Sequence, residues 1–524
     1  MVYEISDFKK NNKKLWFIFS RIISIASVLF LFLIILTWVL SFYKINTFLF
    51  YVFFWIIVIF YSWWLIRWFE YVILLILWYL RYKWYQELDL KNILDKKPKN
   101  KQENMIYNQY LKSNKRIDDL YHWVIIPTFQ DPYDMLKDNF EAIKQSNYNN
   151  QKIIITLAWE QVDKENFKEI KDKFLKEYAD TFYFVNSTLH PKWIEWEIQG
   201  KGSNVNYAIK NTYKKILDFW INDDNILVSV MDSESIVQNT YFDAMSLEYC
   251  LTSKDMQDKT IYQPMLFLFN RFFLAPFFSK VISLSTTFYI LAASIKWIWT
   301  RAQAIQMQSL KSLLQTNFYS AETITEDGHQ YYRTYCVFNW KFQVKPVYTY
   351  VLLEPVIWRN LMESIKLQYN QIKRWAHGAL DLPYIIICFL KNKKLPRLRT
   401  LYEIFWLTES SVLWSSLQFI LFFWTIYFYI LWWVYGDVMV KFWLLGFVIL
   451  IILNIITLFF FPWNSLKSKR YKIYEASKYI ILSFTVMWPM LLILNWLPAL
   501  HAQMLILFWK PMWKFNVTKK YRDE

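Results

Sequence analysis

Residues 226–234, Ile-Leu-Val-Ser-Val-Met-Asp-Ser-Glu, decide the fold of this chain. The first six form a short apolar run with several β-branched residues, which predicts a buried strand, and they lead directly into two carboxylates, Asp232 and Glu234. Further strands are predicted at 121–127, 153–157 and 182–185, and helices at 134–146 and 163–178. This alternation predicts an α/β domain with a mainly parallel sheet, in which ligands bind at the carboxyl ends of the strands.

Hydrophobic residues are segregated along the chain. They make up 55% of the 524 residues, while charged residues still make up 20%. Five apolar runs have about the 20 residues that a helix needs to cross a bilayer, and they are 15–42, 46–66, 412–434, 438–461 and 476–497. The first run is too long for a signal peptide and lacks its cleavage pattern, so we interpret it as a retained helix. A sixth stretch, 272–300, is interrupted by Pro276, Lys280 and Lys296 and is interpreted as an interfacial amphipathic segment.

Positive charge predicts the orientation of these helices. Lysines flank the first two runs on the side away from the loop between them, which places both flanks in the cytoplasm. They are Lys9, Lys10, Lys13 and Lys14 before the first run, and Lys91, Lys96, Lys97, Lys99 and Lys101 after the second. The sequence therefore predicts a multi-pass protein of the inner (plasma) membrane. Its parts are a two-helix region with an amphipathic segment at 1–88, a cytoplasmic domain with interfacial helices at 89–400, and about three helices with a basic tail at 401–524.

The net charge of +17 could suggest a nucleic acid partner, but the excess lies largely in clusters beside the apolar runs. Membrane lipids with anionic headgroups are therefore the predicted partner, and no nucleic acid is expected. The three cysteines, Cys250, Cys336 and Cys388, show no pairing pattern and no CxxC spacing. Neither a disulfide framework nor a zinc site is predicted.

The two carboxylates after residue 231 have a spacing that suits a hard divalent cation. Asp232 and Glu234 can ligate such an ion, which in turn bridges two phosphates. Acidic pairs at strand ends are also common in solvated loops, and the pair alone does not separate the two interpretations. Its position directly after a buried apolar strand favours the metal.

Two further motifs suit the same chemistry. Lys201 lies between Gly200 and Gly202, which offers a flexible backbone and a cation to phosphate, although a surface turn would look the same. The run Thr325-Glu326-Asp327 supplies a carboxylate that can take a proton from an acceptor hydroxyl. A threonine before acidic residues also suits a helix N-cap, and the local sequence leaves both interpretations open.

The last motif is Gln-Ile-Lys-Arg-Trp at 371–375. Helical spacing places Gln371, Arg374 and Trp375 on one face, where an amide, a guanidinium and an indole are presented together. These groups suit a diphosphate and the face of a sugar ring. The alternative is an amphipathic helix near the membrane.

In this order, and between two sets of apolar runs, the motifs resemble those of membrane-embedded glycosyltransferase family 2, the family of the cellulose, chitin and hyaluronan synthases. The motifs that carry the resemblance lie within residues 120–385. Within the family, the chain resembles an uncharacterised bacterial branch. It implies a GT-A-like, Rossmann-like α/β domain in the cytoplasm, flanked by transmembrane α-helices. It also implies an inverting hexosyltransferase that uses a nucleotide-sugar donor, expected to be a UDP-sugar, and a divalent metal, Mg2+ or Mn2+.

The resemblance further implies roles for individual residues. Asp327, with Glu326 beside it, matches the catalytic base, and Asp232 and Glu234 match an Asp-x-Asp metal motif in which glutamate replaces the second aspartate. The matches for donor binding are Pro127, Thr128 and Asp131 in the first-strand motif, Glu160 near the nucleobase of the donor, Lys201 near its diphosphate, Asp232, and Gln371, Arg374 and Trp375.

The expected function is transfer of a sugar to a growing polysaccharide, with export through the helices. One alternative is a single addition to a lipid-linked acceptor, which would use the same chemistry. Another, from a different class, is a catalytically inactive membrane scaffold or receptor, which the altered metal motif would allow.

The chain has 6 glycines and 29 tryptophans. Glycine normally makes up about 7% of residues, and two tryptophans, Trp193 and Trp196, precede the predicted phosphate loop, where bulky side chains are awkward. A gene whose UGA codons mean glycine, translated as though they meant tryptophan, would show this exchange. Tryptophan enrichment at membrane interfaces is the alternative. We hypothesise that many tryptophans are natively glycine, among them Trp159, Trp193, Trp196, Trp340 and Trp509.

Overall fold

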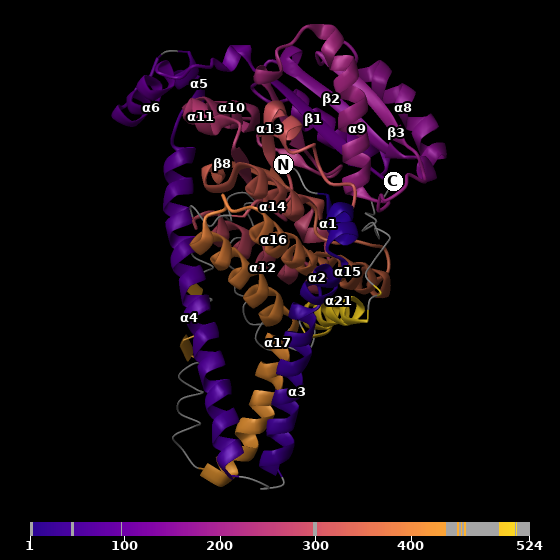
Figure 1. Cartoon of the computed structure of the whole chain (residues 1–524). Helices are drawn as coiled ribbons and strands as arrows, with labels where there is room; N and C mark the ends of the chain where they lie inside the picture. Colours follow the sequence, from indigo (N-terminus) through magenta and orange to yellow (C-terminus); the bar gives the residue numbers. More distant parts are fainter. Residues whose placement is uncertain are drawn as a thin grey trace.

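The computed structural model describes residues 4–42, 47–95, 97–296, 301–435, 448–449, 452, 455–456, 492–508 and 510. Figure 1 shows an α/β domain at one end of the molecule and long helices that extend away from it at the other. Helix α3 (Ile22–Phe42) contacts both α4 (Thr47–Gln86) and α17 (Arg397–Tyr435). Apolar helices from both ends of the chain therefore lie side by side.

The domain is built on an eight-stranded sheet with the order β3-β2-β1-β4-β7-β6-β8-β5. The strands are β1 (Tyr121–Thr128), β2 (Ile153–Glu160), β3 (Phe184–His190), β4 (Ile226–Val230), β5 (Ile236–Val237), β6 (Thr260–Phe267), β7 (Met307–Ser309) and β8 (Gln343–Leu352). Strands β3, β2, β1 and β4 pair in parallel, as do β6 and β8. Strand β7 is antiparallel to both neighbours and β5 is antiparallel to β8. The sheet is thus mixed rather than mainly parallel, because β7 inserts antiparallel between the two parallel groups.

The helices beside the parallel half agree with the sequence prediction. The prediction of helices at 134–146 and 163–178 is confirmed by α7 (Tyr133–Lys144) and α8 (Lys164–Tyr178).

Further helices of the described residues are α1 (Ile5–Asn11), α2 (Lys13–Phe19), α9 (Lys201–Ile216), α10 (Tyr241–Leu251), α12 (Phe277–Ser294), α14 (Glu326–Phe338), α15 (Leu361–Ala376), α16 (Asp381–Lys391) and α21 (Leu497–Leu507).

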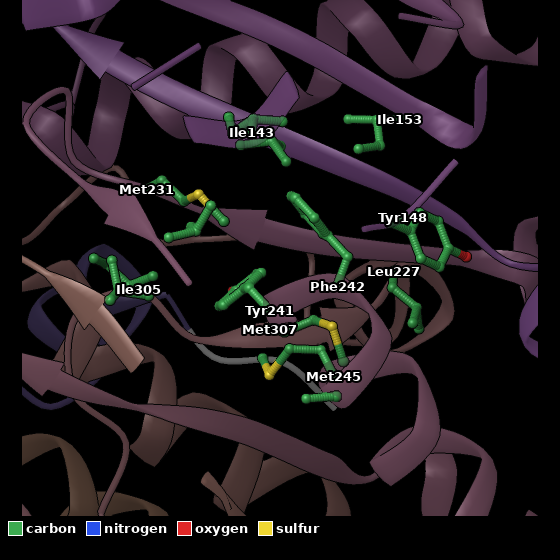
Figure 2. Close-up of a cluster of buried hydrophobic side chains, with 14 of the residues drawn as sticks. Ile143, Tyr148, Ile153, Leu227, Met231, Tyr241, Phe242, Met245, Ile305 and Met307 are labelled. Carbon is green, nitrogen blue, oxygen red and sulfur yellow. The ribbon is translucent and has the colours of Figure 1, made fainter. Parts of the chain in front are cut away.

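Both faces of the parallel half are buried. Successive side chains of a strand point to opposite faces of the sheet, and here each face packs into its own hydrophobic cluster. In β1, Val124 and Ile126 belong to one hydrophobic cluster, and Trp123 and Ile125 belong to another on the opposite face. The first cluster includes residues of α7, α8 and α10, and Figure 2 shows the part of it around Phe242. The second includes residues of α9. Each fully buried side chain of this size contributes about 1.5–3 kcal/mol, so the strand ends that carry the site rest on a packed core.

Three described helices are long and apolar enough to cross a membrane by length and composition, and they are Lys13–Leu33, Ser62–Gln86 and Phe277–Ser294. Residues 47–66 of the predicted run 46–66 belong to α4, which continues unbroken for 40 residues, or about 60 Å. That is twice the hydrocarbon thickness of about 30 Å. Leu75 and Trp78, in the second half of α4, are fully buried in a cluster with residues of β6. The second half of α4 therefore packs on the α/β domain.

The other apolar runs are described in part. The stretch 272–300, expected at the membrane interface, contains α12, of which 61% is buried inside the protein. The run 412–434 lies within α17. Most of 438–461 and 476–497, the tail from 511, and Trp509 lie outside the described residues.

Candidate functional site

Four charged side chains meet where β4 ends and where α9 and α14 begin. Lys201 Nζ lies 3.0 Å from Asp232 Oδ1, 3.1 Å from Glu326 Oε1 and 2.9 Å from Asp327 Oδ2. Lys201 and Glu326 are largely buried, whereas the side chain of Asp232 keeps 27% of its surface exposed. We call these four residues the Lys201 cluster. Each of them is a site residue predicted from the sequence, and in the structure Lys201 contacts all three carboxylates directly.

The ends of three elements place the Lys201 cluster. Asp232 lies two residues after the end of β4, and its backbone oxygen accepts a hydrogen bond from Asn139 Nδ2 at 3.1 Å. Lys201 is the first residue of α9, which follows β3, and Glu326 is the first residue of α14. Side chains that follow strand ends are thereby directed to the edge of the sheet where ligands bind in α/β folds.

The close approach of α9 and α14 depends on Gly202. A Cβ atom at this position would lie 2.8 Å from the Ser320 carbonyl oxygen and 3.0 Å from Glu326 Cβ. It would also lie 3.3 Å from the carbonyl oxygen of Thr323. Any side chain here would therefore push the segment 320–326 away from Lys201, and the glycine permits the backbone contact.

Burial and charge together set the protonation of the Lys201 cluster. Burial disfavours the charge on Lys201, but the carboxylates of Asp232, Asp327 and Glu326 outweigh it and hold the pKa of Lys201 well above its usual range. Burial raises the pKa of Asp327 to about 7, and the charges of Glu326 and Asp232 add to the rise while Lys201 opposes it. Asp327 can therefore gain or lose a proton near neutral pH.

One oxygen of Asp327 is left for another partner. Oδ2 contacts Lys201, whereas Oδ1 is buried and accepts no hydrogen bond from any described residue. The backbone oxygen of Asp327 accepts from Gln306 Nε2 at 3.3 Å, which fixes the main chain there. A positioned carboxylate with a free acceptor oxygen and a pKa near 7 has what a general base needs.

Three more residues named from the sequence lie within electrostatic reach. Burial lowers the pKa of Arg374, on α15, while Glu234 and the three carboxylates of the Lys201 cluster oppose this. Burial raises the pKa of Asp131 to about 6, and the charge of Glu234 adds to the rise. The structure therefore gathers five carboxylates and two cations from β1, β4, α9, α14 and α15.

The remaining residues of the motifs lie at the edges of this group. Pro127 and Thr128 end β1, and Thr128 is buried. Gln371 Oε1 accepts a hydrogen bond from Gln368 Nε2 at 3.0 Å on the same helix. The ring of Trp375 packs against a hydrophobic cluster that includes residues of α12.

Glu160 has a partner that the sequence did not predict. It ends β2, and its Oε2 lies 3.0 Å from Nδ1 of His190, which ends β3 and whose Nε2 lies 2.8 Å from Glu197 Oε2. Burial lowers the pKa of His190, but the two carboxylates outweigh it and raise that pKa to about 9. Oε1 of Glu160 is buried without a hydrogen-bond partner among the described residues. Glu160 is thus held by His190 at the same edge of the sheet, outside direct contact with Lys201.

The residues present fit a metal held jointly with phosphate. No group of three or more His, Cys, Asp or Glu side chains among the described residues is arranged to hold an ion alone. Mg2+ in nucleotide sites is commonly bound by one or two carboxylates plus substrate phosphates. Asp232 and Glu234 supply that number, and the excess of carboxylates over cations around them favours a divalent ion.

Helix α14 is held by residues that no sequence motif marks. His329 Nδ1 lies 2.6 Å from Asp381 Oδ1, and Tyr331 donates to Glu403 Oε1 at 2.7 Å. Arg333 is paired with Glu4 near the N-terminus. The partners lie 52, 72 and 329 residues away along the chain, so no local pattern signals these contacts.

No family model matches the chain, and no curated protein sequence matches it. Among solved structures, it is similar to a mannosyltransferase, PcManGT from Pyrobaculum calidifontis, in complex with GDP-Man and Mn2+. The TM-score is 0.41 and the identity 10%, over 83% of this chain and 99% of that one. It is also similar to residues 1–349 of S. aureus TarS in complex with UDP-GlcNAc, with a TM-score of 0.30, 10% identity and coverage of 57% and 72%. Both TM-scores are below 0.5, so these similarities carry no argument about function.

Proposed function

We propose that this chain is a membrane-bound inverting glycosyltransferase with a GT-A-like domain. It would move a sugar from a nucleotide-sugar donor, expected to be a UDP-sugar, to a growing polysaccharide that is exported. The Lys201 cluster carries the proposal. In it, a carboxylate with a free oxygen and a pKa near 7 lies beside a lysine and a half-buried aspartate that suit a metal-bound diphosphate.

Each charged residue has a role in this reaction. Asp327 Oδ1 accepts the proton of the acceptor hydroxyl as that oxygen attacks the anomeric carbon on the face opposite the diphosphate. The bond from the anomeric carbon to the diphosphate oxygen breaks, so the configuration inverts without a covalent intermediate. Lys201 and Arg374 bind oxygens of the leaving diphosphate, Arg374 with the forked geometry that suits phosphate.

Asp232 and Glu234 would hold the divalent metal, Mg2+ or Mn2+. When bound, the ion neutralises charge on the leaving nucleoside diphosphate. Asp131 and Glu160, at the ends of β1 and β2, would contact the nucleoside together with Pro127 and Thr128. Gln371 and Trp375 would lie toward the sugar and the acceptor terminus.

The proposed location is the inner membrane, with the α/β domain in the cytoplasm, where nucleotide sugars are made. Helices long and apolar enough to cross a bilayer, and the lysine clusters that flank the first two apolar runs, support it. The acceptor would be a glycan or a lipid-linked saccharide. Anionic lipids would contact the flanking lysines.

A panel of labelled UDP-glucose, UDP-GlcNAc and GDP-mannose, incubated with the purified full-length protein and Mn2+, tests the proposal. We expect metal-dependent transfer or hydrolysis of at least one donor, and none with Asp327→Asn. The absence of turnover with every donor in native membranes would favour the inactive scaffold. Product length then separates polymer growth from a single addition to a lipid-linked acceptor.

A further inference from the structure

The segment before the first apolar helix is built into the α/β domain. Phe8 of α1 is fully buried against Tyr384 of α16, with ring centroids 5.2 Å apart. Ile5 belongs to the same hydrophobic cluster, which includes residues of α14 and α16. The sequence predicts this segment only as the basic flank of a membrane helix.

Glu4 forms a bidentate ion pair with Arg333 of α14. Arg333 Nη1 donates to Oε2 at 2.7 Å and Nη2 donates to Oε1 at 2.9 Å. The side chain of Arg333 is fully buried, and its Nη2 also donates to the carbonyl oxygen of Thr316 at 2.7 Å. Asn317 Nδ2 donates to the same Glu4 carboxylate at 3.2 Å. One carboxylate therefore joins α14 to the segment that precedes it.

Ser6 holds the next part of that segment. Its backbone nitrogen and its Oγ donate to the two carboxylate oxygens of Glu322, at 2.5 and 2.6 Å. On either side of Glu322, the carbonyl oxygens of Ser320 and Thr323 crowd Gly202 at the start of α9. The segment 316–325 thus lies between α1 and α9, and it leads directly into the first turn of α14.

We propose that Glu4 is a positioning residue for Asp327. Through Arg333, and with Ser6 beside it, Glu4 fixes the segment 316–325 and the first turn of α14, so that Asp327 is held against Lys201. Because α1 leads through α2 into α3, the placement of an apolar helix is coupled to that of the base. The inference rests on the proposed function, in which Asp327 takes the proton.

Glu4→Gln in the full-length protein tests this role, because it removes the charge and keeps the size. The buried Arg333 cation then lacks its counter-charge, and α14 shifts. Since small displacements of a base are costly, we expect kcat to fall about tenfold, with the donor KM and the affinity for UDP with Mn2+ unchanged. Glu4→Asp, which keeps the charge, should recover most of the rate. Asp172→Asn, at an exposed carboxylate of α8, is the matched control.

The pH profile separates positioning from a loss of folded protein. Lys201 lowers the pKa of Asp327, whereas burial, Glu326 and Asp232 raise it. A base displaced from Lys201 should therefore show a higher apparent pKa in kcat/KM than the wild type. An unchanged kcat and pH profile in Glu4→Gln overturns the inference, as does a fall in kcat matched by lost UDP binding. If the wild type transfers no sugar, the proposed function fails instead.

A different observation concerns two tryptophans with a left-handed backbone. Trp196 has a φ of 70° and Trp220 a φ of 56°, a region that favours glycine. Trp220 closes a short 3₁₀ helix, where glycine is the preferred residue. Its side chain is 95% exposed, so no packing accounts for an indole there.

We infer that positions 196 and 220 carry glycine in the protein that the host makes. UGA codons read as tryptophan in this sequence, and as glycine in the cell, would also explain 6 glycines against 29 tryptophans. The exposed side chains of Trp193 and Trp340 fit the same exchange, whereas Trp159 is fully buried and its burial does not decide its identity.

Peptide masses from the native protein test this inference directly. We expect glycine at 196 and 220 and UGA at both codons. In the recombinant chain, Trp196→Gly with Trp220→Gly should raise the urea midpoint, while Trp78→Gly, at a buried position, should lower it. A native peptide with tryptophan at either position, or a destabilised double variant, overturns the inference.

Discussion

The two halves of the sheet contribute to the site in different ways. In the parallel half, the functional side chains lie just after strands or at the start of the next helix. Asp232 lies two residues after β4, and Lys201 is the first residue of α9. Beside the antiparallel strand β7, Glu326 and Asp327 come from α14, which partners far along the chain hold in place. The donor side is therefore set locally and the base side by distant contacts. Changes on the two sides should affect different steps.

The largest expected effect is from Asp327→Asn, on the base side. An amide cannot take the acceptor proton, and general bases contribute on the order of 10²–10⁴-fold, so we expect kcat to fall by roughly 10³-fold. Binding of UDP with Mn2+, measured by calorimetry, should stay within about twofold of the wild type. An equal loss of rate and binding would break the distinction between the two sides. Asp172→Asn serves as the control for charge removal at a distance.

The next largest effect is from Asp232→Asn, on the donor side. Its carboxylate is one of the two that would hold the metal. Mutations that weaken a metal site typically lower metal affinity by about 10–100-fold, and we expect the affinity for UDP to fall by a similar factor. The loss should appear only when Mn2+ is present, which titrations with and without the ion would show. A variant that binds UDP normally and only turns over slowly would place Asp232 with the base instead. Asp118→Asn, at an exposed carboxylate, is the control.

The third expected effect is a pH dependence of the base side, which UDP binding measured at each pH separates from the titration of Asp131 on the donor side, whose pKa burial raises to about 6. Burial raises the pKa of Asp327 to about 7, and the base must be deprotonated to act. We therefore expect kcat/KM to fall about tenfold per pH unit below 7 and to level off above it. An aspartate of ordinary pKa, near 3.9, would give a flat profile over that range. Rates from pH 5 to 9, with UDP binding measured at each pH, would distinguish the two.

The parallel half could be predicted from the sequence because its signals are local. Strands at 121–127, 153–157 and 226–231 are predicted from largely apolar runs and match β1, β2 and β4, whereas the strand predicted at 182–185 overlaps β3 only at 184–185. The carboxylates at 232 and 327 were recognised by their motifs. The rule that ligands bind at the carboxyl ends of strands places Asp232 at this edge of the sheet, whereas Asp327 reaches Lys201 from α14, which distant contacts hold in place.

The other half could not be predicted because its pairings join distant segments. Strand β7 has three residues and is antiparallel to β4 and to β6. No apolar pattern of that length is informative. The partners of Glu160 and Arg333 were missed for the same reason, since hydrogen bonds to His190 and Glu4 depend on the folded chain. The length of α4 was missed because an apolar run shows where a helix can span a bilayer, not where that helix ends.

The smallest expected effect is at Gly202, where the donor side touches the base side. In Gly202→Ala, the new Cβ would lie 2.8 Å from the Ser320 carbonyl oxygen, so the segment before α14 must move by a few tenths of an ångström. A displacement of that size should lower kcat by roughly fivefold and leave UDP binding nearly unchanged. Gly378→Ala is the matched control, since a Cβ there meets nothing within 4 Å. If Gly202→Ala behaves like Gly378→Ala, the segment yields without moving Asp327, and this contact does not couple the two sides.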